Sequence, residues 1–215
     1  MELPIQYIHA ILDRSGSMSG KISDVVGGFR TNIHNLKDEE FFDIYVSAKM
    51  FDHEQDTIIP NTNVKEFTDE CFDEAMKNYV PRGQTALRDA LGDSINYFIT
   101  MYDMSTVKYQ SCMIYVMTDG LENASRNPNY TSDKLGLLIK KAENYNIKVF
   151  YIGANQDAIL NASNIGISEN QAINYTENTQ NVESVFRSLS SVAHRIRSNQ
   201  DVGFNENERL TSVES

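Results

Sequence analysis

The sequence predicts one α/β domain with a doubly wound, Rossmann-like sheet that is mostly parallel, has one antiparallel edge strand, and carries helices on both faces. Apolar, β-prone runs alternate along the chain with segments whose apolar residues recur at helical spacing. The run at 112–117 is continuously apolar, which is typical of a strand buried on both faces of a parallel sheet. A length of 215 residues suits a single hydrophobic core.

The first half of the chain predicts a strand, a helix and a hairpin. Residues 5–12 form an apolar run that stops at Asp13, so we expect the first strand there. Apolar residues then recur at helical spacing from Ile22 to Leu36, although Gly27 and Gly28 weaken the helix propensity. Residues 44–51 and 57–59 are predicted strands joined by a polar stretch, which indicates a hairpin at one sheet edge.

The second half continues the alternation. A helix is expected to start near Thr85 and to be followed by the strand at 112–117, which we place beside the first strand. Further expected elements are a helix at 135–145, a strand at 148–152, a weak strand at 173–175 and a closing helix at 182–196. The domain is therefore expected to span 1–197, and the mostly polar residues 198–215 to form a flexible tail.

The charge and composition exclude several classes of function. Lys and Arg number 19 against 30 Asp and Glu, and the net charge of −11 repels phosphate backbones and anionic membranes. No apolar run approaches the roughly 20 residues that a membrane span needs, and no basic segment precedes an apolar one at the start. With only Cys71 and Cys112, no disulfide framework is expected. We expect a cytoplasmic protein without nucleic-acid partners or membrane insertion; the sequence does not predict its oligomeric state.

Five oxygen-bearing side chains are expected to meet at the carboxyl edge of the sheet. Asp13, Ser15 and Ser17 form an Asp-x-Ser-x-Ser pattern after the first strand, Thr85 precedes a helix, and Asp119 follows the strand at 112–117. Ligand sites of open parallel sheets form outside the carboxyl ends of the strands, where these loops would converge. Taken singly, each residue is best interpreted as a helix cap or a turn residue. The occurrence of all five at loops that converge favours a shared binding site.

The set suits a hard cation. Two carboxylates and three hydroxyls, without His or Cys in the same loops, favour Mg²⁺, with Mn²⁺ or Ca²⁺ as possible substitutes. Magnesium releases water reluctantly, so the site would keep a position open for an acidic side chain of a partner protein. Arg14 and Glu122 flank the site and are expected to be solvated loop charges. The four histidines show no metal or triad spacing and are expected to be structural: His9, His34, His53 and His194.

Three segments of the chain resemble those of a known family. The segments 13–18, 83–85 and 118–120 look like the three parts of the metal-ion-dependent adhesion site of von Willebrand factor A (VWA) domains. The resemblance implies that Ser15, Ser17 and Thr85 contact the metal through their hydroxyls, and that Asp13 and Asp119 act directly or through water. The segments 79–87, 118–125 and 153–157 resemble compact stand-alone VWA proteins of bacteria and phages.

The first functional hypothesis is a cation-dependent protein-binding module. Two alternatives follow from the resemblance: an adaptor or assembly subunit of an ATPase- or kinase-containing complex, and a viral or phage structural component that would be virion-associated. A metal-dependent hydrolase has the least support. A phosphatase of the Asp-x-Asp type would need a carboxylate at Ser15, and the sequence has no Gly-rich phosphate loop of standard spacing. No enzymatic activity is therefore expected.

Overall fold

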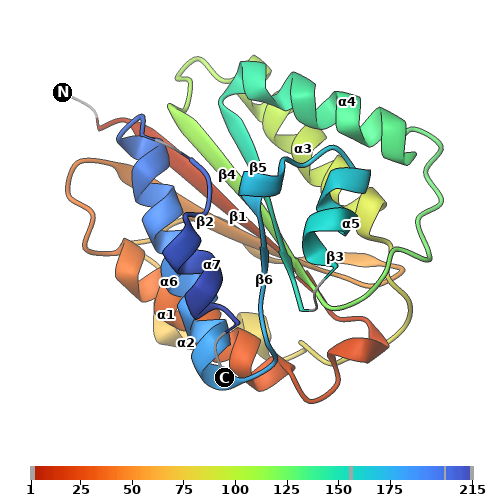
Figure 1. Ribbon diagram of the computed structural model, residues 1–215. Helices are drawn as coiled ribbons and strands as arrows, with labels where there is room; N and C mark the ends of the chain where they lie inside the picture. Colours follow the sequence, from red (N-terminus) through yellow and green to blue (C-terminus); the bar gives the residue numbers. More distant parts are fainter. Residues whose placement is uncertain (1–2, 155–156, 201, 214–215) are drawn as a thin grey trace.

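The computed structural model describes residues 3–154, 157–200 and 202–213, and within them six strands form one sheet in the order β3-β2-β1-β4-β5-β6 (Figure 1). Neighbouring strands pair in parallel except at the edge, where β3 pairs antiparallel with β2. The predicted doubly wound α/β fold with one antiparallel edge strand is confirmed. The strands are β1 (Ile5–Asp13), β2 (Asp43–Phe51), β3 (Gln55–Asn63), β4 (Ser111–Thr118), β5 (Ile147–Gly153) and β6 (Ala172–Asn174).

Helices cover both faces of the sheet, so that two apolar cores form (Figure 1). One core gathers side chains from α1 (Ile22–Leu36), α2 (Asp69–Met76) and α6 (Thr179–Arg197). The other gathers side chains from α3 (Leu87–Met104), α4 (Ser132–Ala142) and α5 (Ala158–Asn164). This arrangement requires central strands that are apolar on both sides, and all residues of β4 are buried, as its sequence predicts.

The strand β1 lies between β2 and β4 and supplies both cores. Ile8, Ala10 and Leu12 face one core while Ile11 belongs to the other, because successive side chains of a strand point to opposite faces. The predicted neighbour relation is confirmed, since Ile8 is paired with Met113 of β4. The carboxyl ends of β1 and β4 therefore reach the same edge of the sheet.

The two glycines that weaken the propensity of α1 have different environments. A Cβ at Gly28 would lie 2.2 Å from a ring carbon of Phe186, whereas a Cβ at Gly27 would meet nothing within 4 Å. Gly28 therefore allows α1 to approach α6 closely, and this packing outweighs its unfavourable helix propensity.

Three short helices were not predicted: α2, α5 and α7 (Glu206–Thr211). The strand β3 is also longer than the predicted 57–59, because antiparallel pairing with β2 orders polar residues that carry little strand signal. Helices of six to eight residues hold about two turns, which is too few for an apolar period to stand out.

Residues 202–213, which lie in the predicted tail, contain the helix α7. Asn205 and Glu208 form a reciprocal capping box at the start of α7, and Glu208 pairs with Arg195 of α6 at 2.8 Å. Phe204 is 5% exposed and packs edge-on against Phe150. One buried aromatic ring, a cap and an ion pair order a segment whose composition is mostly polar. The domain boundary at 197 stays a prediction.

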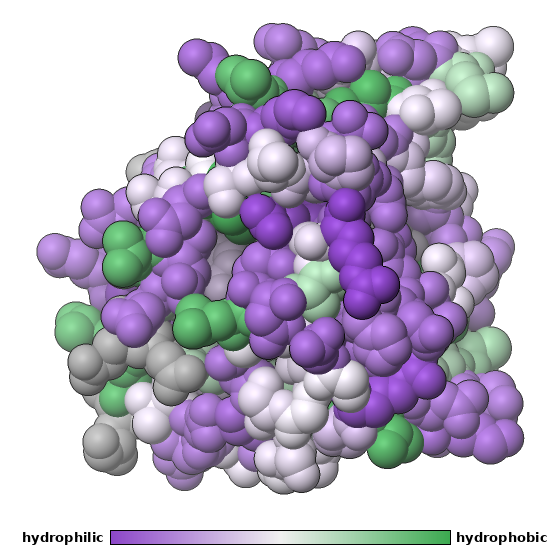
Figure 2. Space-filling view, turned by 90° about the vertical axis from the view of Figure 1, so that its right-hand side faces the viewer, coloured by the Kyte–Doolittle hydropathy of each residue, from purple (hydrophilic) through white to green (hydrophobic). Residues whose placement is uncertain are grey.

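The surface is mainly polar. Figure 2 shows one face on which hydrophilic residues predominate and hydrophobic ones form small separate groups. None of the helices in the described ranges combines the length and apolar character needed to cross a bilayer.

Candidate metal centre

The carboxylate of Asp13 is fully buried at the carboxyl end of β1. Its Oδ1 accepts a hydrogen bond from the backbone N–H of Ser15 at 2.6 Å, and its Oδ2 accepts one from the Thr118 hydroxyl at the end of β4. The hydroxyl of Tyr79 donates to the Asp13 carbonyl oxygen at 2.7 Å. The ends of two neighbouring strands and the start of the loop after β1 are thereby held in one arrangement.

Three hydroxyl groups from two loops converge at Gly120. A Cβ built on Gly120 would lie 2.8 Å from Thr85 Oγ1, 3.3 Å from Ser17 Oγ and 3.4 Å from Ser15 Oγ. The space above Gly120 that a side chain would fill is thus surrounded by three oxygens. The structure brings these residues together as the sequence predicts.

Asp119 completes the group. The hydroxyl of Ser17 donates to Asp119 Oδ1 at 2.6 Å, and the hydroxyls of Ser15 and Ser17 lie 3.1 Å apart. All five predicted residues therefore belong to one cluster at the carboxyl edge, with Asp13 joined to it through Ser15 and Thr118.

The alternative roles of these residues as helix caps are not what the structure shows. The N-cap position of α1 is occupied by Lys21 and that of α3 by Ala86, one position after Thr85, and neither residue makes a side-chain cap hydrogen bond. Ser15 precedes a single 3₁₀ turn (Gly16–Met18) but makes no side-chain cap hydrogen bond there. The hydroxyls of Ser15 and Thr85 therefore do not cap the N-terminus of a helix.

Backbone contacts fix the position of Thr85. Its N–H donates to Asn123 Oδ1 at 2.9 Å, and its carbonyl oxygen accepts from the N–H groups of Asn123 and Ala124. The N–H of Gly16 donates to the Gly83 carbonyl oxygen at 3.3 Å, which ties the first loop to the second. The first motif segment is thus joined to the second, and the second to residues 123–124, which follow the third. Nothing in the local sequence of Asn123 indicates this contact.

Lys21 is the main residue that sequence reasoning missed. Its ammonium pairs with Asp119 Oδ2 and, at 2.6 Å, with Glu177 Oε1 just before α6. Asp119 is 1% exposed at its side chain, so a cation is already attracted to the carboxylate of this cluster. Lys21 follows a glycine in the first loop, but its partner Asp119 lies 98 residues away, which a local pattern cannot reveal.

Electrostatics at the site favour a positive ligand. Burial raises the pKa of Asp13, the hydrogen bonds from Thr118 and Ser15 lower it, and the nearby charge of Asp119 raises it again, so that the net pKa lies above the ordinary value. Removing a carboxylate from water and placing it near another is costly unless a cation neutralises them. The all-oxygen donor set around Gly120 fits a hard divalent ion of the magnesium type.

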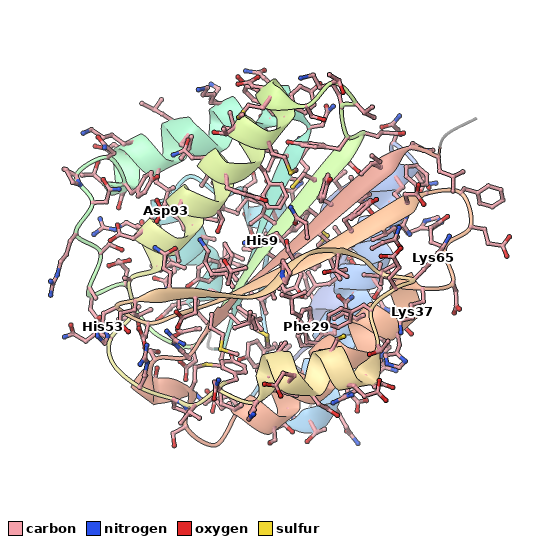
Figure 3. The ribbon with its side chains drawn as sticks, turned by 180° about the vertical axis from the view of Figure 1, so that it is seen from behind. His9, Phe29, Lys37, His53, Lys65 and Asp93 are labelled. Atoms are coloured by element: carbon pink, nitrogen blue, oxygen red, sulfur yellow. The ribbon has the colours of Figure 1, made fainter. Side chains whose placement is uncertain are left out.

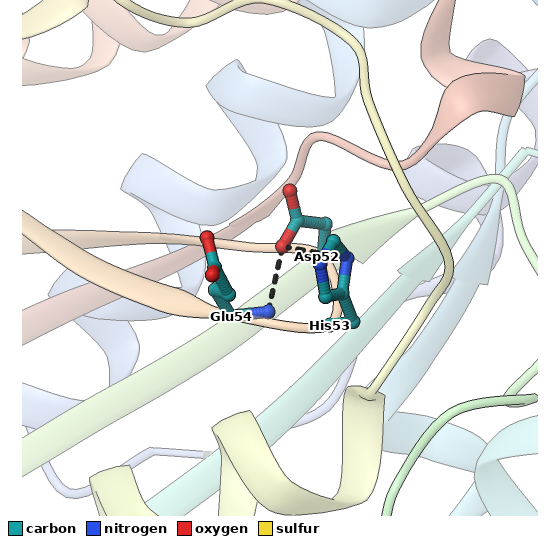
Figure 4. Close-up of side chains that lie close together, drawn as sticks. All are labelled: Asp52, His53 and Glu54. Carbon is teal, nitrogen blue, oxygen red and sulfur yellow. Dashed lines mark hydrogen bonds and ion pairs between the residues drawn. The ribbon is translucent and has the colours of Figure 1, made fainter.

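A second group of possible metal ligands, Asp52, His53 and Glu54, lies in the hairpin between β2 and β3 (Figure 4). Asp52 is fully buried and already pairs with Arg14 at 3.2 Å and Arg82 at 2.7 Å. Although burial raises it, the pKa of Asp52 is lowered overall by the Glu54 N–H and the two guanidinium groups. A metal ion here would meet two cations, so this group is an ion-pair cluster that connects the loops.

The expectation of solvated charges beside the site is wrong for Arg14 and Glu122. Arg14 is 4% exposed, since it pairs with buried Asp52. Glu122 accepts from the N–H groups of Arg88 and Ser125 and thereby joins its loop to the first turn of α3. Both residues hold together loops that lie beside the site.

Comparison with known proteins shows the fold. No family model matches the sequence, and no curated protein matches it. The PilB minor pilin from Streptococcus sanguinis has a TM-score of 0.68 at 15% identity, over 88% of this chain and 61% of that one. A von Willebrand factor type A protein from Catenulispora acidiphila has a TM-score of 0.63 at 15% identity, over 89% of this chain and 42% of that one.

Proximal thread matrix protein 1 from the mussel byssus, solved with a zinc-occupied MIDAS motif, has a TM-score of 0.62 at 19% identity, over 90% of this chain and 49% of that one. This chain spans less than two thirds of the length of each of these three proteins. Its strand order, covering helices and structural likeness agree, and the chain therefore has the fold of a von Willebrand factor A domain.

Proposed function

We propose that this chain is a protein-binding module in which a divalent cation of the magnesium type links the domain to an acidic side chain of its partner. The observation that carries the proposal is the convergence of the Ser15, Ser17 and Thr85 hydroxyls at Gly120, with Asp119 bonded to Ser17. Asp13 and Asp119 would supply negative charge, and the three hydroxyls would supply neutral oxygen ligands. When bound, the cation supplies positive charge to which a partner carboxylate can coordinate.

The chain's own charge makes such recognition depend on the cation. At −11, the domain repels an acidic partner at long range. A cation held between Asp13 and Asp119 offsets that repulsion where the partner carboxylate approaches. Partner binding should therefore require the metal, because the negatively charged domain does not itself attract an acidic partner.

Metal binding is the first step to test. Isothermal titration with Mg²⁺, Mn²⁺, Ca²⁺ and Zn²⁺ should show one site in the wild type and none in Asp13→Ala or Asp119→Ala. Asp133→Ala is the matched control, because Asp133 is exposed in the first turn of α4, away from the cluster. If Asp119→Ala bound the metals as well as the wild type does, the proposed centre would be wrong.

Acidic-ligand recognition is the second step. Peptides with one central Glu or Asp, paired with identical peptides carrying Gln or Asn, should bind the wild type only in Mg²⁺ and only in the acidic form. A pull-down from source lysate in Mg²⁺ and in chelator, with wild type and Asp13→Ala, would then identify the partner. Equal capture in all four conditions would contradict the proposal. The adaptor, virion and hydrolase alternatives stay predictions that no particular contact favours.

A further inference from the structure

A pocket lies between α3 and the strands β1 to β3, apart from the residues of the metal centre. Its volume is about 340 Å³, at the small end of the range for ligand sites. His9 on β1 and Asp93 on α3 lie on this side of the sheet, which Figure 3 shows from behind. The pocket forms because α3, α4 and α5 cover the centre of the sheet, while β2 contributes only Phe51 to the core beneath them.

The floor of the pocket is a neutral hydrogen-bond chain. The Ser94 hydroxyl donates to the Ala90 carbonyl oxygen at 2.8 Å, so it must accept from His9 Nε2 at 3.1 Å. His9 is buried, and burial, with a smaller effect of Lys49, lowers its pKa to about 3. The neutral ring therefore carries its hydrogen on Nε2, and Nδ1 accepts from the Ser47 hydroxyl at 2.8 Å. Both ring nitrogens form hydrogen bonds within the protein, so the His9 ring is fixed in place on the floor of the pocket.

Two opposite charges lie in the pocket without an ion-pair partner. Lys49 Nζ donates to Gln55 Oε1 at 2.8 Å, and Gln55 Nε2 donates to Asp93 Oδ2 at 2.9 Å. Within the described part of the chain, neither Lys49 nor Asp93 forms a salt bridge, and Lys49 makes this single side-chain hydrogen bond. Asp93 is exposed, and its Oδ1 also accepts from the Tyr130 hydroxyl at 2.9 Å. Burial lowers the pKa of Lys49, and the charge of Asp93 opposes that effect only in part. The ammonium keeps two N–H groups for a ligand anion.

The pocket also contains an unused acceptor. Asn61 Nδ2 donates to the Tyr97 hydroxyl at 3.0 Å and approaches the Met101 thioether, which only accepts. The Asn61 Oδ1 atom is buried and has no hydrogen-bond partner. A buried acceptor without a donor is unfavourable, so a ligand N–H at this place would be stabilised. Pro60 lines the pocket next to it and supplies exposed apolar surface.

We propose that this pocket binds a free α-amino acid, with the ligand carboxylate on Lys49 and the ligand ammonium on Asp93 and Asn61. A simple anion would be repelled by Asp93 and a simple cation by Lys49, whereas a zwitterion satisfies both. The amide of Gln55 now spans the two charges, accepting from the ammonium and donating to the carboxylate as an amino acid would. The ligand replaces Gln55 in this role, and the ligand side chain lies on Pro60.

The test uses the full chain in chelator, so that its outcome is independent of the metal centre. The standard amino acids are screened singly up to about 10 mM by thermal shift, and each one that stabilises the protein is titrated by calorimetry. Lys49→Met and Asp93→Asn should each weaken binding by roughly tenfold to a hundredfold, because each loses a charge-assisted hydrogen bond. The matched controls Lys148→Met and Asp133→Asn, on β5 and α4, should bind as the wild type does.

Ligand analogues keep the proposal testable if a pocket variant does not fold. In wild-type protein, the N-acetyl derivative and the methyl ester of the best amino acid should each bind at least about tenfold more weakly than the parent. Failure of every amino acid to bind, binding of either derivative as tight as that of the parent amino acid, or wild-type affinity in folded Lys49→Met and Asp93→Asn would overturn the proposal. The Lys49, Gln55 and Asp93 contacts would then be a purely structural network.

Discussion

Replacing Gly120 with alanine tests the metal centre without removing any proposed ligand. The added Cβ would lie 2.8 Å from Thr85 Oγ1, so this hydroxyl would have to move by about half an ångström to regain an ordinary contact. Magnesium requires near-octahedral geometry with oxygens at about 2.0–2.1 Å, and a shift of that size removes the hydroxyl from the coordination shell. We expect the affinity for Mg²⁺ and Mn²⁺ to fall by roughly 10- to 100-fold.

The assay is a Mn²⁺ titration followed by electron paramagnetic resonance of the free ion, with circular dichroism to check folding. Gly16→Ala is the matched control in the neighbouring loop, because a Cβ there would lie 3.7 Å from the Gly83 carbonyl oxygen, an ordinary contact. Gly16→Ala should keep wild-type affinity. Wild-type Mn²⁺ affinity in folded Gly120→Ala would show that the three hydroxyls do not surround the metal, and would refute the reasoning.

Three further perturbations follow from the same contacts. Lys21→Met should bind Mn²⁺ roughly fivefold more tightly than the wild type, since its ammonium competes for Asp119 and a partly exposed pair contributes about 1 kcal/mol; unchanged or weaker binding would count against competition. Because the pKa of His9 is lowered to about 3, the unfolded chain binds a proton below pH 6.5 that the folded chain does not. The free energy of unfolding therefore carries no penalty from His9 above pH 6.5, and below it falls by up to about 1.4 kcal/mol per pH unit. Urea unfolding at pH 7, 6 and 5 should show a flatter dependence for His9→Gln, and equal slopes would contradict this. Gly28→Ala should destabilise the fold by about 1–3 kcal/mol because its Cβ meets α6, whereas Gly27→Ala should stabilise it by about 0.5–1 kcal/mol; chemical denaturation measures both, and equal effects would show that α1 and α6 do not pack as described.

Long, periodic elements could be predicted from the sequence, and short ones could not. The helices α1, α3 and α6 have 15 to 19 residues, so that their apolar faces repeat several times. The seven residues of α5 give no such repeat. The order of α7 depends on Phe204 and Glu208 meeting other parts of the chain, which is a tertiary effect that composition does not contain.

The candidate site could be predicted as a set of residues because strand ends of a parallel sheet converge. The motif positions Asp13 and Asp119 follow from that rule, whereas Thr85 lies just before α3 and not at the end of a strand. The contacts of Lys21 and Asn123 could not be predicted, because they depend on pairs far apart in the chain. The pocket around Lys49 had no signal either, since its groups come from separate strands and a helix and form no motif.

The ordered C-terminal segment also protects the sheet from self-association. At the end of β6, the Thr176 N–H donates to the Ser212 carbonyl oxygen at 3.0 Å, and the Ser212 hydroxyl donates to the Asn174 carbonyl oxygen at 2.7 Å. The opposite edge, β3, contains Pro60 and register irregularities against β2, both of which discourage a further strand from adding. A chain that ended at 197 would keep the protection at β3 but expose the β6 edge, so it would tend to aggregate through that side.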